Sequence, residues 1–283
     1  MSVIGSNKRL IFCEGDDGSL DRRLLNRMLK GKPPTSVIVP AGGKHQMRAF
    51  VRGRLSVEKS AVDYVALRDR DFDVEPPSQI GLIPVGSGGA VFMLYRSAIE
   101  NYMLESVLIH QYWQWHSVAS NAPGWSHGVS PGEEDIQQWI AESADRIINY
   151  QAARWALAKL KPGARWPEVA TTWTTGSGQL PASLTADDCV DAAVRLIDEF
   201  GKATSDVTES RFKAEYARFV DTFSEPGFQN QSQFLVWFHG KDLQKAMQQL
   251  RPNTISLKHF LDWAVENLDW SLHPDLLQLS QKI

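Results

Sequence analysis

Cysteine is scarce in this chain of 283 residues, and the two that it has, Cys13 and Cys189, lie far apart. They predict neither a disulfide framework nor a zinc site, and this usage is typical of a reducing compartment. No apolar run approaches the roughly 18 residues that a membrane-spanning helix needs. Residues 1–8 lack the apolar stretch of a signal peptide. We therefore expect a cytoplasmic protein that does not associate with a membrane.

Neither sign of charge predominates, because the net charge is only −3. The total gives no sign of a nucleic-acid-binding protein, but the distribution is uneven. The first 75 residues hold 14 Lys and Arg against 10 Asp and Glu, and the remaining residues hold 16 against 23. This asymmetry weakly favours an anionic partner near the N-terminal part. With 43% hydrophobic and 22% charged residues, the composition is that of an ordinary globular protein of one or two domains.

The first third of the chain alternates short apolar runs with helical patterns. Apolar runs at residues 9–13, 36–39 and 63–67 predict three strands. Apolar spacing predicts a helix over residues 19–31, and a second helix is expected over residues 44–55. Because strands and helices alternate, we expect an α/β fold whose parallel sheet has right-handed crossovers and helices on both faces.

A hairpin and a further helix complete this part. Residues 80–85 and 90–95 read as its two strands, and Gly86-Ser-Gly-Gly89 forms the turn. The same glycines could hold a phosphate, although they lack the strand-to-helix context and the lysine of a P-loop. A helix is expected from Ser97 to about His110. We expect residues 1–110 to form the catalytic domain.

The second part is expected to be mostly helical, after a loop over residues 111–132. Helical patterns run at about 133–160, 185–201, 207–223, 242–250 and 256–268. We expect residues 111–283 to form a helical domain for dimer or partner contacts.

Acidic residues follow the ends of two predicted parallel strands. Glu14 follows the first strand, and Asp69, Asp71 and Asp73 follow the third. Ligands bind at the carboxyl ends of such strands, where distant residues come together. Clustered carboxylates need a cation or raised pKa values, and their hard oxygens favour Mg²⁺ or Mn²⁺. The alternative is that these acids form strand-end turns and helix caps, where Asp is common.

Two segments carry a resemblance to a known fold. Phe12-Cys-Glu14-Gly15 and Leu67-Arg-Asp69-Arg-Asp71 resemble the motifs of the Toprim fold, a Glu-Gly followed by an Asp-x-Asp. The match covers roughly residues 8–110 and implies a Toprim-like parallel sheet flanked by helices. Pro40-Ala-Gly-Gly-Lys44 and Arg96-Ser-Ala-Ile-Glu100-Asn-Tyr102 are similar to segments of stand-alone Toprim nucleases encoded beside an ABC-type ATPase. These are the OLD-like nucleases and the AriB-type effectors of PARIS anti-phage systems.

The resemblance implies a metal-dependent endonuclease that an ABC-type ATPase partner restrains until a phage protein is sensed. It implies that Glu14 is a general base or metal ligand and that Asp69 and Asp71 are metal ligands. Glu100 would be a further acid of the metal site, unless it is only a first-turn helix acid. Asp73 could take the place of the third Asp found in topoisomerases. Two Mg²⁺ or Mn²⁺ ions would activate the attacking water and stabilise the leaving oxygen.

Four basic residues are candidates for contacting nucleic acid. Lys44 begins a predicted helix beside two glycines, where free backbone N–H groups attract phosphate. Arg68 and Arg70 flank the acids, and they would either bind the scissile phosphate or neutralise the cluster. Lys241 follows the apolar run 234–238. A late strand there would bring Lys241 to the metals, whereas the alternative is a helix break with ordinary caps.

The substrate and the reaction class are left with alternatives. The AriB likeness points to tRNA, which we favour, and the OLD likeness points to DNA. A homodimer would let two sites cut paired positions. The rival functions are a non-catalytic adaptor regulated by the ATPase, and a hydrolase of small phosphate esters. The intact set of acids argues against the adaptor and does not exclude the phosphate-ester hydrolase.

Overall fold

The computed structural model describes residues 9–32, 35–57, 63–86, 89–119, 127–160, 182–183 and 185–283. The chain forms two compact units. The first comprises Met1–Ile148 together with Glu225–Ile283, and the second comprises Asn149–Ser224. The last 59 residues, counted from 225 to 283, therefore belong to the same unit as the N-terminal part.

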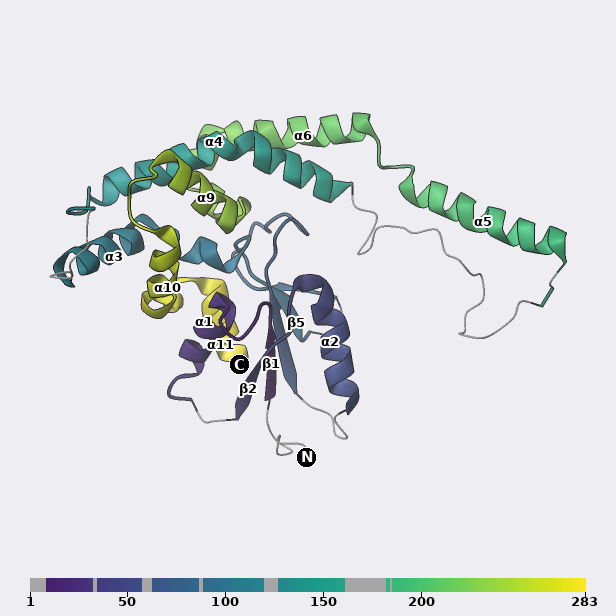
Figure 1. Ribbon diagram of the computed structural model, residues 1–283, viewed down its shortest axis with the longest axis horizontal. Helices are drawn as coiled ribbons and strands as arrows, with labels where there is room; N and C mark the ends of the chain where they lie inside the picture. Colours follow the sequence, from purple (N-terminus) through teal and green to yellow (C-terminus); the bar gives the residue numbers. More distant parts are fainter. Residues whose placement is uncertain are drawn as a thin grey trace. The chain divides into compact units, whose positions relative to one another are not determined.

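The first unit contains a five-stranded sheet (Figure 1). Its strands are β1 Arg9–Cys13, β2 Ser36–Pro40, β3 Tyr64–Arg68, β4 Ile83–Pro84 and β5 Val91–Met93. The order is β2-β1-β3-β5-β4, in which β4 alone runs antiparallel to its neighbour. The predicted α/β class, the three parallel strands and the β4–β5 hairpin are thus confirmed.

Helices α1 (Leu20–Leu29) and α2 (Lys44–Val57) cover opposite faces of this sheet (Figure 1). Leu10 and Phe12 of β1 pack with Met47 of α2 in one buried core. Because side chains alternate along a strand, Ile11 and Cys13 point to the other face, where α1 lies. Burial of the Cys13 thiol raises its pKa to about 12, so this cysteine is a neutral core residue.

The segment after β5 differs from the expected single helix over residues 97–110. A 3₁₀ turn, η1 (Ile99–Tyr102), comes first, and α3 (Ser106–Ala119) follows it. Asn101 Oδ1 accepts the N–H of Ala98 at 3.1 Å and closes the short turn. Helix α3 runs well into the expected loop because Tyr112 and Trp113 are buried against the rest of the unit. The loop expected from residue 111 to 119 was therefore wrong.

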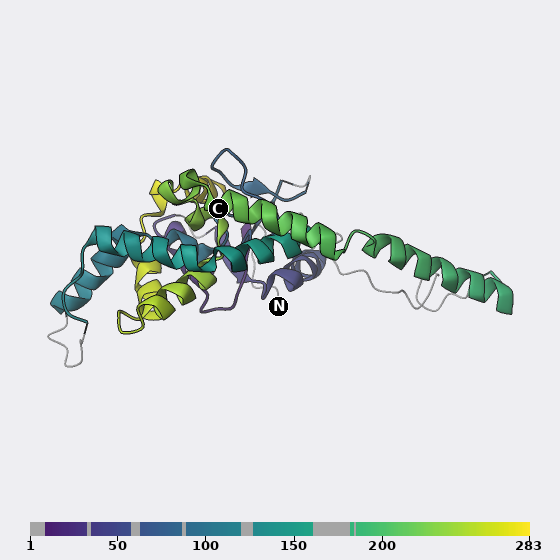
Figure 2. The same ribbon diagram turned by 90° about the horizontal axis from the view of Figure 1, so that it is seen from above.

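The C-terminal segment returns to the sheet as a series of helices (Figures 1 and 2). After α4 (Glu133–Lys159), whose first part belongs to this unit, they are α7 Pro226–Asn230, α8 Phe234–Trp237, α9 Gly240–Leu250, α10 Leu257–Asn267, η2 Trp270–Leu272 and α11 Pro274–Lys282. Helix α10 packs on α1 and α3, while α8 and α9 pack on η1. The apolar run at 234–238 is a short helix, so the late strand was wrong and the helix break is confirmed.

The second unit is helical. It contains the end of α4, α5 (Ala186–Thr204) and α6 (Glu209–Ser224). Trp155 of α4 packs on Phe219 of α6 with ring centroids 5.5 Å apart. Thr185 caps α5, because its side chain accepts the backbone N–H of Asp188. Within the described residues, no helix combines the length and apolar character needed to cross a bilayer.

Candidate active site

Glu14 lies directly after β1, at the carboxyl edge of the sheet. Gly15 follows with φ +88° and exchanges two backbone hydrogen bonds with Gly42, at 2.9 and 3.1 Å. A Cβ added to Gly15 would lie 2.4 Å from Ser19 Cβ, at the start of α1. Only glycine fits this turn, so the Glu-Gly pair is explained by geometry: the glycine allows the close approach that fixes Glu14 at the strand end.

Asp69 and Asp71 follow β3, the strand next to β1. Phe12 pairs with Ala66, so extending the parallel register brings Glu14 level with the end of β3. Asp69 is buried, and its Oδ1 accepts the N–H of Ile99 at 3.1 Å. Asp71 has φ +49°, in the left-handed region that is unusual for a residue other than glycine. Its N–H donates to Ser97 O at 2.8 Å, so the segment from Ser97 to the first residue of η1 supports both acids.

Asp21 is an acid of this site that the sequence analysis missed. It lies in the first turn of α1 and is buried, with the face that Leu24, Leu25 and Met28 form. Burial, and after it repulsion from Glu100 and Glu14, raise its pKa to about 7. Its Oδ1 has no hydrogen-bond partner in the described part of the chain. The signal was available, because an Asp three and four residues before two core leucines must point inward.

Glu100 lies in η1 and is only 5% exposed. Its Oε1 is 3.6 Å from Lys241 Nζ, and its Oε2 is buried without a hydrogen-bond partner among the described residues. The pKa of Asp69 is raised well above its ordinary value, first by burial and then by repulsion from the other four acids, Asp21, Glu100, Asp71 and Glu14. Five carboxylates from β1, α1, β3 and η1 thus share one electrostatic environment.

The beginning of α9 closes the site on the side of the C-terminal segment. Attraction to Glu100 raises the pKa of Lys241, and Asp69 and Asp21 add to the rise, so the ammonium stays charged. Gly240 packs so tightly on η1 that an added Cβ would lie 2.7 Å from Asn101 Oδ1. Asn101 in turn donates to the carbonyls of Leu235 and Phe238, at 3.0 and 2.8 Å. Lys241 therefore lies beside the acids although a helix, and not a strand, brings it there.

The other basic candidates differ in their placement. Arg68 pairs with Asp73, Nη2 to Oδ2 at 2.9 Å, so these two neutralise each other. Arg70 is fully buried and donates to the carbonyls of Tyr95, Val74 and Val236 at 2.6–3.0 Å. This placement gives Arg70 a structural role and leaves none of its surface for a phosphate. Lys44 is the first residue of α2, as expected, but its side chain lies outside the described residues.

The donors can be compared with the needs of a hard divalent cation. As they stand, no three Asp, Glu, His or Cys side chains of the described residues are arranged as a ligand set. Two buried oxygens, Asp21 Oδ1 and Glu100 Oε2, nevertheless have no hydrogen-bond partner there, and burial together with mutual repulsion raises the pKa values of Asp21 and Asp69. An all-oxygen, electron-rich donor set suits Mg²⁺ or Mn²⁺ in chemistry and in charge. Side-chain rotations would have to close it around the ion.

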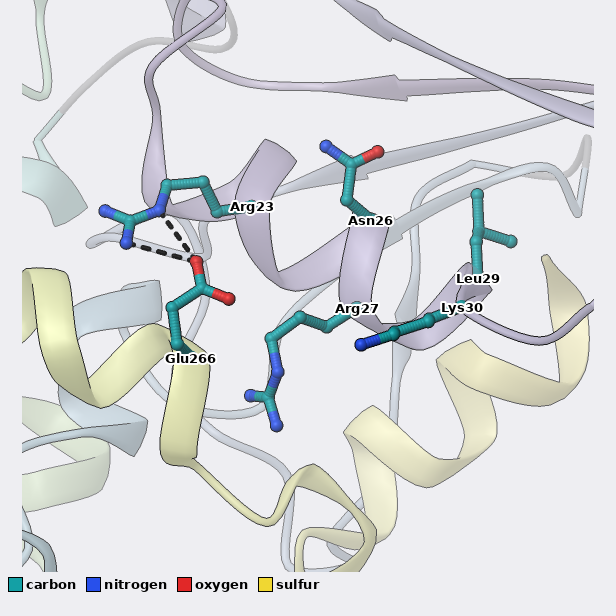
Figure 3. A pocket seen from close by; sticks show the side chains of 6 residues that line it. All are labelled: Arg23, Asn26, Arg27, Leu29, Lys30 and Glu266. Atoms are coloured by element: carbon teal, nitrogen blue, oxygen red, sulfur yellow. Dashed lines mark hydrogen bonds and ion pairs between the residues drawn. The ribbon is translucent and has the colours of Figure 1, made fainter.

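An open basic hollow of about 730 Å³ lies elsewhere in the first unit (Figure 3). Its lining comprises Arg23, Asn26, Arg27, Leu29, Lys30 and Glu266. Arg23 pairs with Glu266 and Asp262, and Arg27 donates to two carbonyls at the end of α10. These guanidinium groups hold α10 against α1, which is a structural role.

Comparisons with known protein families and with curated proteins found no match. The likeness to Toprim nucleases accordingly rests on the sequence motifs.

Proposed function

We propose that this chain is a Toprim-type endonuclease that needs Mg²⁺ or Mn²⁺ to hydrolyse phosphodiester bonds of nucleic acids. One observation carries the proposal: Asp69 and Asp21 are buried at the carboxyl edge of a parallel sheet, and burial, followed by repulsion from the other acids of the cluster, raises their pKa values. Such a cluster opposes folding unless a ligand compensates its charge. Perturbed acids of this kind gather at functional sites.

The residues divide into ligands and supports. Glu14, Asp69, Asp71 and Glu100 would hold two metal ions, with Asp21 beside them on α1. The bound metal would supply an activated water and positive charge for the leaving oxygen. Ile99 orients Asp69 through its backbone N–H. The charged ammonium of Lys241 lies at the rim, where a phosphate group would meet it.

The substrate and the setting rest on the resemblance of the sequence motifs. We favour tRNA as the substrate, with DNA as the second candidate. In this proposal the protein is a cytoplasmic, homodimeric effector of an anti-phage system, and an ABC-type ATPase controls it. Co-expression gives a direct test: the chain alone should be toxic to cells, and the ATPase encoded beside it should relieve the toxicity.

Cleavage assays test the activity itself. The purified chain is incubated with tRNA and with supercoiled plasmid, in Mg²⁺, Mn²⁺ or EDTA. We expect cleavage only with metal, and none by Glu14→Gln or Asp69→Asn. Asp17→Asn is the matched control, because Asp17 lies three residues after Glu14 on the surface and pairs with Arg22. Cleavage that survives Glu14→Gln would refute the proposal.

The same purified protein can be used to distinguish the proposed nuclease from the two rival functions. A hydrolase of small phosphate esters should cleave a generic phosphate monoester and leave both nucleic acids intact. A non-catalytic adaptor should bind no divalent metal in a calorimetric titration. A wild-type protein that binds Mn²⁺ and cuts nucleic acid would exclude both.

A further inference from the structure

We propose that His239 is a positioning residue that orients the Asp71 carboxylate toward the metal site. The inference rests on the proposed function, and it assigns a role to a residue outside the two acidic motifs. His239 comes from the C-terminal segment, 168 positions beyond Asp71, since 239 minus 71 is 168. The contact between them joins α9 to the end of β3.

The orientation of the two ring nitrogens of His239 follows from its place in the chain. His239 is the N-cap of α9, and its Nδ1 accepts the backbone N–H of Lys241 at 3.3 Å. A neutral imidazole that accepts through Nδ1 carries its proton on Nε2. Nε2 lies 3.4 Å from Asp71 Oδ1, so the N–H side of the ring faces the carboxylate. Helix capping thereby selects the tautomer that can donate to Asp71.

One contact holds the ring of His239 and two others hold the backbone beside it. It stacks on Phe72 with centroids 6.1 Å apart and planes 14° apart. Phe238, the residue before it, is fully buried, and Gly240, the residue after it, packs against Asn101. The side chain of His239 is only 13% exposed. A ring fixed in this way presents its donor at a constant position, which a flexible surface side chain would not do.

Asp71 is less deeply buried than Asp69 and Glu100. Its backbone is in the left-handed region, and its side chain is 25% exposed. Repulsion from Asp69 would drive the carboxylate outward, because the two groups raise each other's energy. A hydrogen bond from Nε2 restrains the carboxylate and leaves its other oxygen for a cation. Groups that hydrogen-bond metal ligands in this manner typically contribute about 10- to 100-fold to metal affinity.

Two variants separate this role from simple capping of α9. His239→Asn keeps a good N-cap acceptor but is too short to reach Asp71. His239→Gln keeps an N–H donor about as far from the backbone as Nε2, while it caps the helix poorly. His259→Asn is the matched control, because His259 lies on the exposed surface of α10. Each full-length variant is titrated with Mn²⁺ by calorimetry, and its thermal midpoint is recorded in EDTA.

We expect His239→Asn to keep the wild-type midpoint and to bind Mn²⁺ about 10-fold more weakly or worse. His239→Gln should recover most of the affinity despite a lower midpoint, and His259→Asn should match the wild type. If His239→Asn binds Mn²⁺ as tightly as the wild type, the positioning role is refuted while the proposed function survives. If the wild type binds no Mn²⁺, the proposed function is refuted and the role of His239 falls with it.

Discussion

Replacing Asp21 with Asn should stabilise the metal-free protein, and the gain should depend on pH. Asp21 is buried at the N-terminal end of α1, and its pKa rises from 3.8 to about 7 on folding. The causes are burial, then repulsion from Glu100 and Glu14. Asn has nearly the same shape as a protonated Asp, so the substitution removes the charge and leaves the packing intact.

The sign follows from proton binding. Below pH 3.8 Asp21 is protonated in both the folded and the unfolded chain, so the substitution should change the free energy of unfolding little. Between pH 3.8 and about 7 the folded chain keeps a proton that the unfolded chain has lost, so the charge increasingly opposes folding. Each pKa unit corresponds to about 1.4 kcal/mol. The rise from 3.8 to about 7 therefore gives a cost of about 4 kcal/mol, fully present above pH 7.

Urea denaturation in EDTA, followed by tryptophan fluorescence, measures this cost. The quantity of interest is the difference between Asp21→Asn and wild type at pH 4, 6 and 8. It should be near zero at pH 4, grow through pH 6 and level off at pH 8. Asp17→Asn is the control and should show no such trend, because the Asp17 side chain is 86% exposed. A difference that is flat with pH, or largest at pH 4, would refute the electrostatic account of the site.

Three substitutions test the contacts that hold the site together. Arg70→Met should lower the free energy of unfolding by about 3 kcal/mol in the same urea assay, because the carbonyls of three residues lose the buried guanidinium that donates to them. An unchanged midpoint would contradict the structural role of Arg70. Gly240→Ala should lower the free energy of unfolding by about 1–3 kcal/mol, because the added Cβ would collide with Asn101. Gly227→Ala is its control: an added Cβ there meets open space, so thermal melting should show equal or higher stability. Tyr102→Phe should lower the free energy of unfolding by about 1–3 kcal/mol in the urea assay, because the buried carboxylate of Asp275 loses the hydroxyl that donates to it. Equal stability would show that this hydrogen bond contributes nothing.

The sheet could be predicted because its signals are local. The apolar runs at 9–13, 36–39 and 63–67 are strands that any covered parallel sheet requires, and helical spacing separates the first two. Glu14 and the Asp69-Arg-Asp71 segment could be placed at one edge because they directly follow strands that pair in parallel. In each case the evidence lies within about ten residues of sequence.

The rest depended on contacts between distant segments. Arg70 looks like a phosphate ligand beside two acids, yet its guanidinium bonds to Val236, a residue of the C-terminal segment. Trp113 looks like a loop residue among polar neighbours, yet it is buried in the helical part of the unit. Neither contact produces a hydrophobic periodicity that could be recognised in the sequence. Asp21 is different, because its position on the apolar face of α1 was readable and was overlooked.

The site also depends on chain that the predicted catalytic domain, residues 1–110, does not contain. In the structure Asn101 bonds to the carbonyls of Leu235 and Phe238, and Tyr102 donates to Asp275. Arg27 bonds to the end of α10. All of these partners belong to Glu225–Ile283, which completes the first compact unit. A fragment of residues 1–110 would expose the buried face of η1 and leave these donors unpaired, so we expect it to be insoluble or unfolded.

A second fragment should fold, in which a short Gly-Ser linker replaces Asn149–Ser224. Near the two ends to be joined, Gln229 Nε2 donates to Asp145 Oδ1 at 2.6 Å, so a few residues suffice to connect them. Loop closure costs little at that length. Circular dichroism and thermal melting should show a cooperative transition for this protein and none for residues 1–110. If residues 1–110 fold cooperatively by themselves, or if the joined fragment does not, the C-terminal segment is not the structural support of the acidic site that its hydrogen bonds indicate.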